Sequence, residues 1–122
     1  MRHIALVLLL AASTQVLASD KCAVTEHSLA GSWKFVSGTG FFEEFTLSTE
    51  ASTRRFDSWL HQRPEISGAA WTLKKCELIV TPQSGDISPF RLKVVSLKGG
   101  NLRLLDTSDQ TISVYQRIRT EP

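Results

Sequence analysis

The side chains that could take part in catalysis are spread thinly along the chain. His27, His61, Asp57 and Glu43 are the candidates for acid and base chemistry, and several serines offer hydroxyl nucleophiles. A working nucleophile needs an activating base, usually within a recognisable setting such as a nucleophile elbow or a glycine-rich loop. Neither setting stands beside these residues, so each histidine is interpreted as an isolated surface residue. We therefore expect no catalytic residues and no enzyme.

The remaining reactive groups are two cysteines, Cys22 and Cys76. Structural zinc sites use about four cysteine and histidine ligands, which this chain does not cluster, so we expect no metal and no cofactor. Two cysteines in an exported chain are expected to form one disulfide. Closing a loop of about 55 residues would stabilise the fold by about 4 kcal/mol in the chain-entropy model.

Export is indicated by the start of the chain. Arg2 precedes an apolar run over Ile4–Ala12, and small residues follow at Val16-Leu17-Ala18, which is the pattern of a secretory signal peptide. The apolar run is shorter than the roughly 20 residues that span a bilayer. We expect a signal peptide at residues 1–18, a mature domain at 19–122 without a transmembrane segment, and a secreted or periplasmic location.

Charge argues against a nucleic-acid partner. The whole chain carries a formal net charge of +2, which falls to about +1 without Arg2. A nucleic-acid-binding domain needs a concentrated basic face, whereas the pairs Arg54-Arg55 and Lys74-Lys75 read as solvated charges at turns or strand edges. We expect one monomeric domain that binds no nucleic acid.

The elements that must position any site are β-strands. From Gly31 onwards the apolar residues recur with a period of two, and Gly, Ser, Thr, Asp and Pro separate the runs, which is typical of an all-β fold. Short turns such as Lys98-Gly99-Gly100-Asn101 favour antiparallel neighbours. We predict an eight-stranded antiparallel up-and-down barrel, with a two-sheet sandwich as the alternative. The expected strands are Gly31–Ser37, Gly40–Ser48, Thr53–Leu60, Ser67–Leu73, Glu77–Thr81, Pro89–Leu97, Asn101–Asp106 and Thr111–Arg119, preceded by a short helical turn in Ala23–Ala30.

Alternation along these strands predicts which side chains point inward. The expected inner residues are Trp33, Phe35, Phe41, Phe45, Leu47, Phe56, Leu60, Trp71, Leu73, Phe90, Leu92, Val94, Ile112 and Val114. The same alternation places Glu43 inward, where a carboxylate is costly without a partner such as Arg54 or Arg91. Either Glu43 is a polar group inside a cavity, or a β-bulge shifts the strand there. The longest connections, His61–Ile66 and Pro82–Pro89, are candidates for loops over one barrel mouth.

The two ends of the domain resemble a known family. Leu29-Ala30-Gly31-Ser32-Trp33 resembles the Gly-x-Trp signature of lipocalin-like proteins, and Val114-Tyr115-Gln116-Arg117-Ile118 resembles their closing strand. The segments 68–73, 77–80, 90–97 and 101–104 resemble the short bacterial lipocalin-like (calycin-type) domains in order and spacing. The resemblance implies that Gly31 and Trp33 begin the barrel at its closed end, and that an arginine of the last strand lies across the Trp33 ring as a structural contact. Arg117 is the expected residue, and Arg119 is the alternative.

A binding function follows from the aromatic inner face. Trp33, Phe35, Phe45, Phe56, Trp71 and Phe90 are the predicted ligand-binding residues of a pocket for a small hydrophobic molecule. The alternative is that these side chains simply fill the core. The sequence therefore favours a non-catalytic binding protein.

A second resemblance suggests another partner. Secreted bacterial inhibitors of metalloproteases also begin with Leu-Ala-Gly-x-Trp, and their N-terminal tail enters the protease. The corresponding tail here is Ser19-Asp20-Lys21. This resemblance implies, as the alternative function, inhibition of a protease partner through the tail or the loops.

Overall fold

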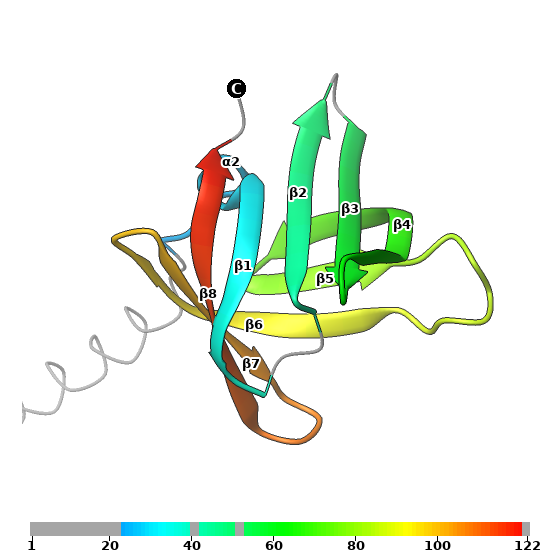
Figure 1. The fold of residues 1–122 in the computed structure, drawn as a ribbon. Coiled ribbons are helices and arrows are strands. Elements are labelled where there is room, and N and C mark those ends of the chain that lie inside the picture. Colours follow the sequence, from blue (N-terminus) through cyan, green and yellow to red (C-terminus); the bar gives the residue numbers. More distant parts are fainter. Residues whose placement is uncertain (1–22, 40–41, 51–52, 121–122) are drawn as a thin grey trace, which may run out of the picture.

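The strands follow one another around a closed barrel in chain order, as the sequence predicts (Figure 1). The structure is a computed structural model and describes residues 23–39, 42–50 and 53–120. In Figure 1, β1, β2, β3 and β8 run upright while β5 and β6 run across, which reflects the strong twist of a small closed sheet. The described residues form eight strands, namely β1 (Gly31–Gly38), β2 (Glu44–Glu50), β3 (Thr53–Leu60), β4 (Arg63–Lys74), β5 (Glu77–Thr81), β6 (Phe90–Lys98), β7 (Asn101–Asp106) and β8 (Thr111–Thr120).

The up-and-down order gives the barrel two distinct ends. At the open end, β1, β3, β5 and β7 finish and β2, β4, β6 and β8 begin. At the closed end, β2, β4, β6 and β8 finish and β1, β3, β5 and β7 begin. The short helix α2 (Glu26–Leu29) lies just before β1 at this end. Thr25 caps this helix by accepting a hydrogen bond from the Ser28 backbone N–H at 3.1 Å, and Arg54 of β3 holds Glu26 at 2.7 Å. The predicted helical turn before β1 is confirmed.

The antiparallel pairing of β1 with β8, which closes the barrel, contains two register shifts, one of them between Phe35 and Ser37. On β8 the inner face consists of Ser113 and Tyr115. The prediction that Ile112 and Val114 point inward is therefore wrong, and Ile112 is 42% exposed. The strand instead buries the larger ring of Tyr115, which removes more apolar surface from water than either aliphatic side chain would.

The connection predicted at His61–Ile66 is a tight hairpin. His61 and Gln62 have φ values of 53° and 64°, the left-handed pair that a two-residue β-turn requires, and β4 begins at Arg63 rather than Ser67. Two register shifts against β3 follow. The prediction that Leu60 points inward is wrong, since Leu60 ends β3 beside the turn and is 39% exposed, whereas Ser58 on the same face is buried.

The start of β2 also differs from the prediction. Pairing begins at Glu44 rather than Gly40, and the chain bends at Glu43, whose carboxylate is exposed and accepts the His61 backbone N–H at 3.2 Å. Glu43 is thus not a group inside a cavity. The bend turns Phe42 inward beside Phe45, whereas Phe41 lies outside the described residues.

Two predictions fall partly or wholly outside the described residues. The signal peptide at residues 1–18 is one. The other is the Cys22–Cys76 bridge: Cys76 lies in the β4–β5 turn with a φ of 62°, and Cys22 precedes the described part of the chain. Both stay predictions. Among the described residues, none of the helices has the length and apolar character that a membrane crossing needs.

Candidate functional site

Trp33 forms the floor of the barrel at the closed end. Its ring is fully buried, and its Nε1 donates to the Leu29 carbonyl at 2.9 Å. The Arg117 guanidinium lies 4.3 Å from the centre of that ring and donates to the carbonyls of Ala30 at 2.8 Å and Ser28 at 2.6 Å. The structure places Arg117 where the lipocalin-like resemblance implies. One side chain thus ties α2, β1 and β8 together.

Gly31 occupies the point where the chain leaves α2 and enters the sheet. Its φ of 140° lies in a region that favours glycine. It is buried and pairs with Leu47 on β2 and Thr120 on β8. The glycine therefore starts the barrel, as predicted, and has no chemistry of its own.

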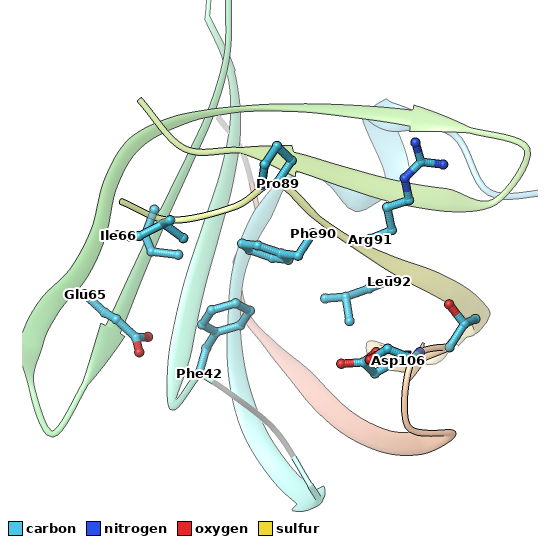
Figure 2. A pocket seen from close by; sticks show the side chains of 11 residues that line it. Phe42, Glu65, Ile66, Pro89, Phe90, Arg91, Leu92 and Asp106 are labelled. Carbon is cyan, nitrogen blue, oxygen red and sulfur yellow. Dashed lines mark hydrogen bonds between the residues drawn. The ribbon is translucent and has the colours of Figure 1, made fainter. Parts of the chain in front are cut away.

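A cleft of about 640 Å³ lies at the open end. This volume is within the range of sites that hold drug-sized molecules, roughly 300 to 1,000 Å³. Figure 2 shows its walls, which come from the start of β4, the connection before β6, the start of β6 and the end of β7. It is lined by Phe42, Glu65, Ile66, Ile87, Pro89, Phe90, Arg91, Leu92, Asp106, Thr107 and Ser108.

The floor of this cleft is the top of an aromatic cluster. Phe42 contacts Phe90 at 5.7 Å and Phe56 at 5.4 Å between ring centres. Beneath them Phe45 stacks on Phe56 at 5.7 Å and meets the edge of Tyr115 at 4.8 Å. Such ring pairs stabilise the core beyond the area they bury. The lower barrel is thus filled by side chains, and the open volume lies above them.

The six predicted ligand-binding residues occupy three levels of the barrel. Phe90 lines the cleft. Phe45 and Phe56 lie directly below it, and Phe35 contacts Tyr115 at 5.8 Å at the side of the cluster. Trp33 and Trp71 lie near the closed end, where the Trp71 Nε1 donates to the Ser48 carbonyl at 3.2 Å.

Sequence reasoning missed Phe42 because the bend at Glu43 reverses simple alternation, and it missed Tyr115 because it assigned the inward phase of the regular strand β8 to Ile112 and Val114. Phe42 becomes an inner residue only through the bend at Glu43. Tyr115 is buried, and its hydroxyl donates to the Phe42 carbonyl at 3.1 Å. Burial raises the pKa of this phenol to about 12, since the charged form would lose its hydration. The hydroxyl therefore stays neutral and serves as a fixed donor.

Two carboxylates border the apolar floor. Figure 2 shows Glu65 and Asp106 on either side of Phe42, while the Arg91 side chain points away from the floor. Glu65 Oε1 accepts a long contact of 3.5 Å from the buried Ser58 hydroxyl. Asp106 Oδ1 accepts from the Ser108 backbone N–H at 2.9 Å and hydroxyl at 2.6 Å. Glu65 lies in the segment predicted as a loop over the barrel mouth, and this prediction was the sequence signal that could have identified Glu65 as a site residue.

The residues considered for catalysis do not converge. His61, on the exposed β3–β4 hairpin, lies 3.8 Å from the carboxylate of Glu43, which precedes β2. Asp57 pairs with Arg55 at 2.9 Å and accepts the Gly68 backbone N–H at 2.8 Å. In the part of the chain that the structure describes, no three His, Cys, Asp or Glu side chains gather in a way that could hold a metal ion.

A second depression of about 460 Å³ lies on the outer surface over β4, β5 and β6. Lys74, Lys75 and Lys93 line it, together with Glu77 and Arg91, which pair at 3.2 Å. These are exposed or half-buried side chains on the outside of the sheet. The depression therefore lacks the apolar floor that distinguishes the cleft at the open end.

Comparison with protein-family models, curated proteins and solved structures finds no match to this chain. The tail Ser19-Asp20-Lys21, on which protease inhibition depends, lies outside the described residues, so that function stays a prediction.

Proposed function

We propose that this chain is an exported, non-catalytic binding protein of the lipocalin-like type, which holds a small hydrophobic ligand in the cleft at the open end. The observation that carries the proposal is the cleft itself: about 640 Å³ above a floor of Phe42, Phe90 and Leu92. Open apolar volume of this size is what a ligand of moderate size needs. The Gly31 start and the Trp33–Arg117 contact support the lipocalin-like assignment.

The filled lower barrel supports a shallow binding mode. Trp33, Phe45 and Phe56 are at most 1% exposed, and a ligand at their level would have to displace packed rings. The rim, in contrast, offers accessible apolar surface, since Ile87 is 39% exposed. The ligand thus rests on the aromatic cluster rather than inside it.

The test uses phenylnaphthylamine, a neutral apolar dye whose fluorescence rises and shifts to the blue in a dry environment. We expect saturable binding at one site. Replacing Ile87→Ser removes apolar rim surface without touching the buried core, and should weaken binding about fivefold, which corresponds to about 1 kcal/mol of lost burial.

Ile118→Ser is the matched control, because Ile118 is 48% exposed on β8 near the closed end. It should leave dye affinity unchanged. Absence of saturable binding by the folded wild-type protein would overturn the proposal. Equal weakening by the two substitutions would show that the dye binds elsewhere.

A further inference from the structure

We infer that the cleft selects a cation, namely a small organic amine that carries an aromatic or aliphatic body. This inference rests on the proposed function and adds to it the chemical class of the ligand. The juxtaposition that supports it is an apolar aromatic floor between two carboxylates, Glu65 and Asp106 (Figure 2). The two carboxylates match the ammonium group of such a ligand, and the aromatic floor matches its apolar body.

Glu65 provides the first carboxylate. It projects from β4, two residues after the strand begins at Arg63, and lines the cleft beside Ile66. Its contact with the Ser58 hydroxyl is 3.5 Å long, which is at the outer limit of a hydrogen bond. An ammonium group is a far stronger donor to a carboxylate than this contact.

Asp106 provides the second carboxylate, from the end of β7. The two bonds from Ser108 both reach Oδ1 and hold the carboxylate in one orientation against the cleft. An ionised carboxylate accepts hydrogen bonds on both of its oxygens. Asp106 can therefore keep both hydrogen bonds from Ser108 on Oδ1 and still accept a hydrogen bond from a ligand on its other oxygen.

The basic residue of the cleft does not offset these charges. Arg91 lines the wall, but its Nη1 lies 3.2 Å from Glu77 Oε1 on the outer face of the sheet, and Figure 2 shows its guanidinium pointing away from Phe42. A ligand on the floor thus faces two carboxylates, while the guanidinium is engaged on the outside.

Aromatic rings strengthen the preference for a cation. Phe42 and Phe90 line the floor, and the face of an aromatic ring attracts an ammonium group. A ligand carboxylate, in contrast, would meet the negative faces of the rings and two like charges. The cleft therefore disfavours fatty acids, although its apolar floor would suit their chains.

The distribution of charged residues over the rest of the barrel also favours a cation at the open end. Asp86 and Asp109 lie in connections at the open end, against Arg63 at the start of β4. At the closed end, Lys74, Lys75 and Lys98 outnumber the acidic residues Glu50 and Glu77 at the adjoining strand ends. A charge gradient along the barrel draws cations towards the mouth and raises their local concentration.

The experiment compares three probes that share one ring system and carry a cationic, a neutral or an anionic substituent, titrated by calorimetry at neutral pH and low salt: naphthylmethylamine, naphthylmethanol and naphthoate. We expect the amine to bind about tenfold more tightly than the alcohol, because two partly exposed ion pairs each contribute up to about fivefold. The naphthoate should bind more weakly than the alcohol.

The isosteric variants Glu65→Gln and Asp106→Asn should each reduce the ratio of amine to alcohol affinity about threefold. They retain an acceptor for Ser58 and Ser108, and the ratio cancels any general loss of binding. Glu50→Gln is the matched control, because Glu50 ends β2 at the closed end of the barrel. It removes the same charge from the protein and should leave the ratio unchanged.

The possible results separate the inference from the proposed function. Equal affinities for the three probes, or tightest binding of naphthoate, would overturn cation selection and leave a hydrophobic binding site. A ratio that falls equally in the Glu50 variant would also overturn it, since overall charge would then explain the preference. If none of the probes binds, the proposed function fails together with the inference.

Discussion

Arg117 offers the sharpest test of how the barrel is closed. Its guanidinium donates to the carbonyls of Ser28 and Ala30 at 2.6 and 2.8 Å and covers the Trp33 ring at 4.3 Å. Arg117→Met keeps most of the aliphatic stem and removes all three contacts. The two carbonyls then lose a charged donor at a half-buried site.

The size of the effect follows from these contacts. A hydrogen bond to a charged group contributes about 1.5 to 3 kcal/mol, and a cation over an indole ring about 0.5 to 2 kcal/mol. Because Arg117 is only half-buried, water replaces part of the loss, and we expect the free energy of unfolding to fall by about 3 kcal/mol. For a domain of this size the melting temperature should drop by about 15 °C.

Urea and thermal unfolding followed by circular dichroism measure the change. Arg103→Met is the matched control, since Arg103 is exposed on the neighbouring strand β7, and its loss should alter stability by less than about 0.5 kcal/mol. Arg117→Lys should be intermediate, because an ammonium group lacks the planar fork that reaches two carbonyls. If the Met variants at positions 117 and 103 prove equally stable, the account of Arg117 as the closing contact is refuted.

Other expectations concern stability and covalent structure. The pKa of Tyr115 is raised from 10.0 to about 12, so the folded state favours the neutral phenol. The free energy of unfolding should therefore be level below pH 10 and fall by up to about 3 kcal/mol towards pH 12. In a pH series of urea titrations, the Tyr115→Phe variant should lack this decline. Asp57→Ala leaves the Gly68 N–H without its 2.8 Å acceptor and should cost about 1 to 2 kcal/mol, whereas Asp57→Asn should retain most of the stability. If Cys22 and Cys76 form the predicted bridge, the intact mass of the oxidised protein is two hydrogens lower than that of the reduced protein. Reduction should also lower the free energy of unfolding by about 4 kcal/mol. An unchanged mass on reduction would contradict the bridge.

Local pattern was sufficient for the architecture. Alternation of apolar residues is a property of each strand by itself, and short turns select antiparallel neighbours. The turns Lys75-Cys76 and Gly99-Gly100 therefore lie where the sequence predicts them, with left-handed backbone at every position. Trp33 could also be placed at the barrel start, because the resemblance of Leu29-Ala30-Gly31-Ser32-Trp33 to the lipocalin-like signature implies that position.

Inner and outer faces were less predictable, since one irregularity reverses all that follows it on a strand, and a wrong choice of phase reverses a regular strand throughout. The bend at Glu43 brings Phe42 into the core, and β8 buries Tyr115 in place of Val114. In both cases an aromatic ring finds a place in the aromatic cluster. Such a choice depends on neighbours that are distant in sequence: the Tyr115 hydroxyl, for example, bonds the Phe42 carbonyl.

The sequence by itself thus determined an all-β barrel and the order of its strands, because these depend on periodicity and on turns between adjacent segments. The residues at the barrel floor were implied by the lipocalin-like resemblance instead. Only the tertiary structure decided where open volume remains and what borders it. Glu65 and Asp106 are far apart in the chain, and the up-and-down closure brings the start of β4 and the end of β7 to one mouth. The physical reason is that a packed interior leaves space only where side chains from separate strands fail to meet.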